Sequence, residues 1–228
     1  MSRPWLSIIL PVLNEAPTLV EALHRLESWR AAGAEVIVVD GGSTDQSREL
    51  AAAGADRVLA APRGRATQMN AGAAASAADL LLFLHADTAL PAAAQAALRA
   101  LPQAPCWGRF DVELDAPGLA LRVVAAMMNW RSRLTGIATG DQAIFVSRGL
   151  FERCGAYPPI PLMEDIALSA QLRRLCKPAC LRPRVRTSAR RWVQGGVLRT
   201  VLLMWGLRLA YFMGVAPARL AVWYRQVR

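Results

Sequence analysis

Polar and acidic side chains follow three apolar runs in the first half of the chain. They are Asn14, Glu15, Asp40, His85 and Asp87. Carboxylate oxygens can hold Mg²⁺ or Mn²⁺, bond to a sugar or a base, or accept a proton. Core packing does not require such residues at these places, so they indicate a ligand site.

The second half adds further candidates. Asp141 stands in a Gly-Asp-Gln turn, and Glu164 and Asp165 precede a helical pattern. Two carboxylates at a helix start can also simply complement the helix dipole. Arg65 follows Gly64 at the expected start of another helix, where phosphate groups bind well, although a surface arginine is the alternative.

Alternating apolar strands and helical segments must position these residues. We expect strands at 6–12, 35–39, 57–61 and 80–84, and helices at 16–29, from 43–45 onward, at 66–78 and at 91–101. Four strand-helix rounds predict a parallel α/β sheet, which binds ligands at the carboxyl ends of its strands.

The second half has a different pattern. Residues 107–115 alternate between apolar and polar, as an antiparallel strand would. We expect helices at 119–134 and 162–175, strands at 143–146 and 181–189, and one long apolar helix at 197–215.

Charge is distributed very unevenly. The 228 residues include 27 basic and 17 acidic ones, and every acidic residue precedes position 166. Residues 166–228 therefore carry a net charge of +13, which predicts an anionic partner. The hydrophobic content of 54% excludes a disordered chain, and recognisable nucleic-acid-binding motifs are absent, so we expect no nucleic acid.

Four segments together resemble the family-2 glycosyltransferases of GT-A fold, in a small bacterial branch with a His-Ala-Asp turn. They are LSIILPVLNEAPTL at 6–19, VIVVDGGSTDQS at 36–47, LLFLHADT at 81–88 and MEDIALSAQLRR at 163–174. The resemblance implies a Rossmann-like, mostly parallel sheet flanked by helices. It also implies an inverting transfer of a sugar from a nucleoside-diphosphate donor to a hydroxyl acceptor.

The resemblance assigns roles on the donor side. Asp87 matches the usual ligand of Mg²⁺ or Mn²⁺, while His85 replaces the commoner first Asp of an Asp-x-Asp motif. Asp40 corresponds to the residue that binds the base. The nucleotide-binding residues implied are Pro11, Asn14, Glu15, Asp40, Gly41, Arg65 and His85.

It assigns roles on the acceptor side as well. Asp165 corresponds to the general base, Glu164 to a residue that orients the loop or binds the acceptor, and Asp141 to the acceptor side. Arg191 and Trp192 partly match a Gln-x-x-Arg-Trp motif of processive members, which binds diphosphate and sugar. Ser188 replaces its Gln, which argues against polymer synthesis.

The basic end of the chain leaves several interpretations open. We expect a glycosyltransferase domain at 1–190 and a basic, apolar helical extension at 191–228. The extension would pack on the domain, pair in a homodimer, or bind an anionic membrane surface where a lipid-linked acceptor could be reached. Arg199 and Arg208 lie about 180° apart on a helix, so no clean amphipathic face is evident.

Location and activity also have alternatives. The N-terminus lacks a signal-peptide cleavage pattern, so we expect a cytoplasmic protein, either free or peripheral on the inner face of the cell membrane. A nucleotidyltransferase, or a nucleotide-binding protein of this fold with little activity, would explain many of the same residues.

Overall fold

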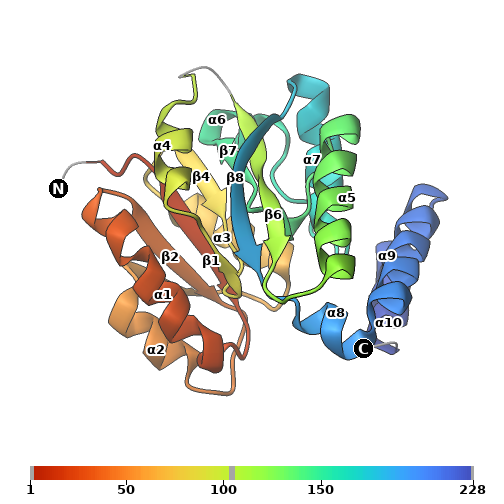
Figure 1. Cartoon of the computed structure of the whole chain (residues 1–228). Coiled ribbons are helices and arrows are strands. Elements are labelled where there is room, and N and C mark those ends of the chain that lie inside the picture. The colour runs from red at the N-terminus through yellow and green to blue at the C-terminus, as the bar shows by residue number, and fades with distance from the viewer. Residues whose placement is uncertain (1–2, 103–105, 227–228) are drawn as a thin grey trace.

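One mixed eight-stranded sheet forms the centre of the computed structural model, which describes residues 3–102 and 106–226 (Figure 1). Its order is β3-β2-β1-β4-β7-β6-β8-β5. The strands are β1 (Ser7–Val12), β2 (Glu35–Asp40), β3 (Arg57–Ala60), β4 (Leu80–Phe83), β5 (Thr88–Ala89), β6 (Trp107–Leu114), β7 (Phe145–Ser147) and β8 (Ala179–Thr187). The four strands expected in the first half pair in parallel, which confirms the predicted α/β class.

Helices cover both faces of this sheet and continue beyond it. They are α1 (Ala16–Ala31), α2 (Ser47–Gly54), α3 (Arg65–Ala75), α4 (Ala93–Arg99), α5 (Leu119–Thr135), α6 (Arg148–Arg153), α7 (Glu164–Leu175), α8 (Arg190–Gly195), α9 (Val197–Phe212) and α10 (Pro217–Gln226). A 3-10 turn, η1, spans Gly140–Gln142. The two-residue β5 and the short α6 are too brief for periodicity to predict.

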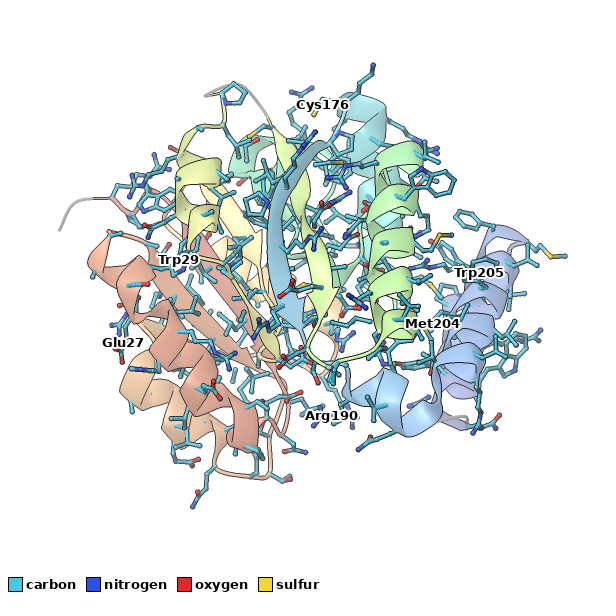
Figure 2. The ribbon with its side chains drawn as sticks, viewed as in Figure 1. Glu27, Trp29, Cys176, Arg190, Met204 and Trp205 are labelled. Atoms are coloured by element: carbon cyan, nitrogen blue, oxygen red, sulfur yellow. The ribbon has the colours of Figure 1, made fainter. Side chains whose placement is uncertain are left out.

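The buried strands β1 and β2 divide the core into two layers. Alternate residues of a strand face opposite sides, so Ile8 packs with the α1 layer while Ile9 packs with the α3 layer. Trp29 points from α1 into the first layer, and Glu27 on the same helix is exposed (Figure 2). This packing fixes the carboxyl ends of β1, β2 and β4 at one edge.

The alternation in β6 places two polar side chains against α5. Arg109 and Asp111 are buried beneath this helix. Asp111 pairs with Arg109 and Arg133, and Arg109 also bonds to Ser132 and to a backbone carbonyl of α5. The strand is antiparallel to β7, as its alternation predicted, but parallel to β8.

Two other element boundaries differ from expectation. The helix expected from 43–45 begins at Ser47, because Ser43 and Asp45 bond to the neighbouring turn instead. The long helix expected at 197–215 ends at Phe212, and α10 follows. Gly214 has a φ of +89° and Pro217 starts α10, and both features favour a break there.

The two C-terminal helices stand beside α5 and reach it from β8 through α8 (Figure 1). Leu207 and Leu220 pack with Ile137, Met163 and Ile166 in one apolar cluster, which we call the tail cluster. Within residues 3–102 and 106–226, no helix has both the length and the apolar character needed to cross a membrane.

Candidate active site

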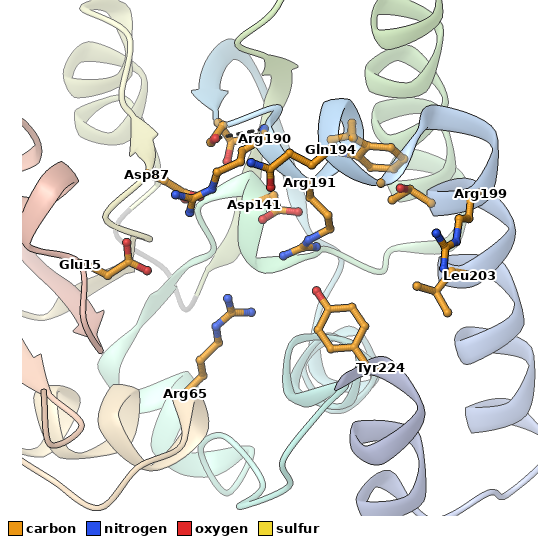
Figure 3. A pocket seen from close by; sticks show the side chains of 15 residues that line it. Glu15, Arg65, Asp87, Asp141, Arg190, Arg191, Gln194, Arg199, Leu203 and Tyr224 are labelled. Carbon is orange, nitrogen blue, oxygen red and sulfur yellow. Dashed lines mark hydrogen bonds between the residues drawn. The ribbon is translucent and has the colours of Figure 1, made fainter. Parts of the chain in front are cut away.

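Charged side chains converge on a cavity of about 240 Å³ between the carboxyl edge of the sheet and the C-terminal helices. Figure 3 shows Arg65, Arg191 and Tyr224 directed into it. Its lining comprises Glu15, Arg65, Asp87, Asp141, Thr187, Ser188, Arg190, Arg191, Trp192, Gln194, Gly195, Arg199, Thr200, Leu203 and Tyr224.

A larger cavity of about 660 Å³ adjoins the first. It is lined by residues 11–15, 63–68, 85–87 and 159–162, together with Glu164, Ala221, Tyr224 and Arg225. The two cavities share Glu15, Arg65, Asp87 and Tyr224. Together they take in ten of the thirteen predicted site residues, whereas Asp40, Gly41 and Asp165 line neither.

The turn after β1 is held by backbone hydrogen bonds to acidic and amide side chains. Asn14 has a φ of +55° and accepts a bond from the Thr44 N–H at 2.8 Å. Asp40, only 4% exposed, accepts bonds from the N–H groups of Gly42 and Ser43. Asp45 accepts bonds from those of Ala16 and Ser47. These side chains therefore shape the wall of the site.

Gly41 makes room for a protein side chain. A Cβ atom there would lie 2.9 Å from Gln68 Oε1. The buried Gln68 amide donates to the carbonyls of Val12 and Val39, both at 2.8 Å, and so ties α3 to β1 and β2. The absence of a side chain at Gly41 therefore leaves room for Gln68.

His85 and Asp141 lie together at the cavity. His85 Nδ1 is 3.5 Å from Asp141 Oδ1, and a Cβ on Gly140 would lie 2.6 Å from His85 Cε1. Burial raises the pKa of Asp141, but His85, Arg191 and Arg65 outweigh it and hold the pKa well below its ordinary value. His85 and the acceptor-side candidate Asp141 thus form one unit.

Asp87 is half-buried and lines both cavities. Within the described part of the chain, its one side-chain hydrogen bond is a long one from Thr88 Oγ1 at 3.4 Å. No cluster of three His, Cys, Asp or Glu side chains suited to a metal occurs among the described residues. A single carboxylate fits the way proteins hold Mg²⁺, which keeps water and substrate phosphate as its other ligands.

Two arginines supply positive charge to the first cavity. Arg65 begins α3, and Arg191 on α8 lies over the Tyr224 ring at 5.7 Å from its centroid. Trp192, next to Arg191, also lines this cavity. Guanidinium groups suit a diphosphate because their planar donors match its oxygens.

Glu164 and Asp165 open α7 but face different surroundings. Glu164 is 7% exposed and lines the larger cavity, and burial followed by the charge of Asp165 raises its pKa, while Arg65 opposes this shift. Asp165 instead accepts bonds from the N–H groups of Gly140, at 2.9 Å, and Ile166, at 2.7 Å. Asp165 therefore links α7 to the Asp141 turn.

Some lining residues were missed by sequence reasoning. Tyr224 belongs to the C-terminal extension, yet it lines both cavities. Thr187, Ser188 and Gln194 also line the first cavity. No local signal marks them, because their position depends on how α8 to α10 return to the sheet.

Residues 7–103 match Glycosyl transferase family 2. This segment is therefore similar to the family-2 glycosyltransferases. A mycobacterial glycosyltransferase of PGL/p-HBAD biosynthesis, from Mycobacterium bovis, is 34% identical over 97 residues. The match covers 40% of this chain, which spans only 38% of that relative's length.

Two further similarities extend the family assignment. An undecaprenyl-phosphate 4-deoxy-4-formamido-L-arabinose transferase of Pseudomonas paraeruginosa is 36% identical over 96 residues, covering 37% of this chain and 28% of that protein. A mannosyltransferase from Pyrobaculum calidifontis, solved with GDP-Man and Mn²⁺, superposes with a TM-score of 0.60 at 22% identity. The superposition covers 82% of this chain and 57% of the mannosyltransferase chain, which confirms the GT-A fold.

Proposed function

We propose that the chain is an inverting glycosyltransferase that moves a sugar from a nucleoside-diphosphate donor to a hydroxyl acceptor. The observation that carries this is the meeting of Asp87 with Arg65 and Arg191 at one cavity of the carboxyl edge. A leaving diphosphate needs positive charge near its oxygens, and these residues provide it or could hold a cation that does. A mannosyltransferase of the same fold was solved with GDP-Man and Mn²⁺, which is compatible with a nucleotide-sugar donor and a divalent cation here.

The residues divide the work by position. Arg65 and Arg191 would orient the diphosphate and stabilise its charge, while Glu15 and the turn held by Asp40 would form the nucleotide wall. Trp192 offers a flat ring on which a sugar can stack. A bound Mg²⁺ or Mn²⁺, with Asp87 as its protein ligand, would neutralise charge on the diphosphate.

Asp165 is our candidate for the base that removes the acceptor proton. Its carboxylate adjoins Gly140, beside Asp141, which the resemblance assigns to the acceptor side. Glu164 competes for the role because it lines the larger cavity and its pKa is raised, which favours proton uptake. The variants Asp165→Asn and Glu164→Gln distinguish which of the two carboxylates acts as the base.

The direct test is to incubate the purified protein with a panel of sugar nucleotides and candidate acceptors and to identify the product. Release of a nucleoside diphosphate supports glycosyl transfer. Release of pyrophosphate would instead indicate a nucleotidyltransferase. Binding without either product, across the panel, would indicate the nucleotide-binding protein.

We also propose that residues 191–228 extend the 1–190 domain and attach it to an anionic membrane surface. Large apolar residues of α9 form one exposed stripe, which spans about 100° opposite the face that packs in the tail cluster. They are Leu198, Leu202, Trp205, Leu209, Phe212 and Met213, and Trp205 is labelled in Figure 2. Arg199 and Arg208 flank this stripe, which reconciles their 180° separation with one amphipathic face.

The charge of the surface favours a lipid bilayer over a second copy of the chain. Residues 166–228 carry 13 basic residues and no acidic ones, so two copies would repel each other while an anionic leaflet would attract them. The lipid-phosphate acceptor named in the Pseudomonas relative is compatible with such attachment. The location would then be the inner face of the cell membrane.

Vesicle flotation separates the alternatives. We expect the protein to float with phosphatidylglycerol vesicles at low salt, to bind less at high salt, and to lose binding in Trp205→Ser/Leu209→Ser. Val20→Ser, which changes an exposed apolar residue of α1, is the matched control and should still float. A wild-type protein that stays in the soluble fraction, or a dimer dissociated by the α9 variant, would contradict membrane attachment.

A further inference from the structure

A half-buried arginine on α5 lacks part of its hydrogen bonding. Arg131 Nη1 donates to the Ile137 carbonyl at 3.3 Å. Its Nη2 atom is buried and has no hydrogen-bond partner in the described part of the chain. A buried charged donor without a partner is costly, and such groups usually meet a protein group, water or a ligand.

A second half-buried arginine lies close by on α9. Arg208 makes no hydrogen bond or ion pair within the described ranges. Its neighbour Leu207 packs with Ile137 in the tail cluster, which brings α9 to the segment that Arg131 contacts. Burial and then the like charge of Arg208 lower the pKa of Arg131 to about 10.

Carboxylates near the pair do not neutralise it by contact. Asp165 favours the charged form of both arginines, and Asp141 favours that of Arg208. Neither carboxylate forms an ion pair with them among the described residues, and the Asp165 oxygens already accept backbone bonds. The two guanidinium charges thus repel each other, and neither guanidinium contacts an anion among the described residues.

We propose that Arg131 and Arg208 bind a phosphate group carried by the acceptor. Two guanidinium charges match a phosphate monoester, which carries close to two negative charges at neutral pH, better than they match one carboxylate. Their planar donors also suit bidentate contact with phosphate oxygens. The site as a phosphate binder stands by itself, whereas its role for the acceptor rests on the proposed function.

The setting of the pair indicates how an amphiphilic phosphate would fit. Besides the stripe on α9, α5 has its own exposed apolar stripe opposite its packed face: Leu119, Val123, Met127, Trp130 and Leu134. Arg131 follows Met127 by four positions and Arg208 precedes Phe212 by four, so each lies about 40° from an apolar residue of its stripe. A phosphate at the pair could therefore extend an apolar chain along either stripe.

The test follows the side-chain Nε–H signals of arginine by NMR while inorganic phosphate is added without any sugar nucleotide. Signals of Arg131 and Arg208, assigned through Arg131→Lys and Arg208→Met, should shift saturably. Affinity at the pair should fall at least tenfold in Arg208→Met. Arg122→Met on α5 and Arg219→Met on α10 change exposed arginines outside both cavities and should leave it unchanged.

The residue-specific signals separate this site from the donor cavity. If phosphate moves only Arg65 and Arg191, or if Arg208→Met binds as tightly at Arg131 as wild type, the proposal is wrong even when the protein is an active transferase. Arg131→Lys keeps the positive charge and the aliphatic stem but removes the guanidinium group. If this variant folds and phosphate binds at Arg208 with unchanged affinity, the proposal that both guanidinium groups bind phosphate is also wrong.

Two phosphate compounds then distinguish the source of the ligand. Monomeric dihexanoyl phosphatidic acid should bind the pair at least tenfold more tightly than glycerol 3-phosphate if the acceptor is a lipid phosphate. Equal affinities would support the phosphate site with a water-soluble ligand. Absence of binding by both compounds at millimolar concentration would overturn it.

Discussion

Two groups of polar residues lie at the same edge of the sheet and serve different purposes. The turn group, Asp40 and Asp45, accepts hydrogen bonds from backbone N–H groups of the neighbouring loops and lines neither cavity. The cavity group, Asp87, Glu164, Arg65 and Arg191, lines open space. Position at a strand end therefore does not by itself distinguish a residue that shapes the site from one that meets a ligand.

The difference lies in whether the protein satisfies the side chain. A carboxylate that accepts N–H bonds stabilises the loop, and its removal leaves buried donors without partners. In the cavity group, among the described residues, the Asp87 side chain accepts one long hydrogen bond and the Glu164 side chain makes none. Variants of the turn group should thus reduce stability, whereas variants of the cavity group should reduce activity.

The largest effect is expected at Asp87. Asp87→Asn should abolish measurable turnover while the melting temperature stays within about 2 °C, because the side chain has little structural bonding. Steady-state assays with saturating Mn²⁺ and a thermal melt would measure both. Asp79→Asn, at a side chain that is 77% exposed, is the matched control. Equal wild-type activity in EDTA and in Mn²⁺ would contradict a metal-dependent mechanism.

The next effect concerns the base. Asp165→Asn should lower kcat by about 10²–10⁴, as loss of a general base does, with little change in nucleotide affinity. Glu164→Gln is the matched comparison at the neighbouring position. If Glu164→Gln suffers the large loss and Asp165→Asn turns over at nearly the wild-type rate, the base is Glu164. If only Asp141→Asn shows the large loss of kcat, the general base is Asp141.

A stability effect is expected in the turn group. Asp40→Asn should lower the free energy of unfolding by about 1–3 kcal/mol. The Asp40 carboxylate accepts hydrogen bonds from two backbone N–H groups, and the amide NH₂ of Asn cannot accept them. Urea denaturation would measure the change against Asp79→Asn. An Asp40→Asn protein as stable as wild type would remove the distinction between the two groups.

The smallest effect concerns pH. The raised pKa of Glu164 means that the folded protein binds its proton more tightly than the unfolded chain. This residue's contribution to stability should therefore decline as pH rises from the ordinary glutamate value through the raised one. Glu164→Gln should flatten that part of the pH-stability curve and be more stable than wild type at neutral pH. A steeper decline in the variant would contradict this assignment.

Much of the fold was predictable because its signals are local. Buried runs such as Val36–Val39 can only be strands, and their polar ends marked the edge that contains both cavities. Asparagine is common in turns, and the positive φ of Asn14 agrees with that preference. Sequence could not decide between structural and ligand-binding roles for Asp40, since the choice depends on which backbone donors the loop presents.

Other features depend on contacts between distant segments. Tyr224 reaches the cavity because α9 and α10 fold back against Ile137 and Met163, a tertiary contact without a local pattern. Arg131 and Arg208 are 77 positions apart and belong to helices whose sequences give no sign of each other. The alternation of β6 was ambiguous in the same way, because α5 supplies the partners of Arg109.

The central claim is that the carboxyl-edge cavity binds a nucleoside diphosphate with help from Asp87. The most direct measurement is the melting temperature of wild type and Asp87→Asn across a panel of nucleoside diphosphates, with and without Mn²⁺. A ligand specific for the folded state raises the melting temperature by mass action. We predict that one nucleoside diphosphate raises it by several degrees in wild type, more with Mn²⁺, and that Asp87→Asn loses the Mn²⁺-dependent part. No shift with any nucleotide, or an identical Mn²⁺-dependent shift in the variant, would contradict the claim.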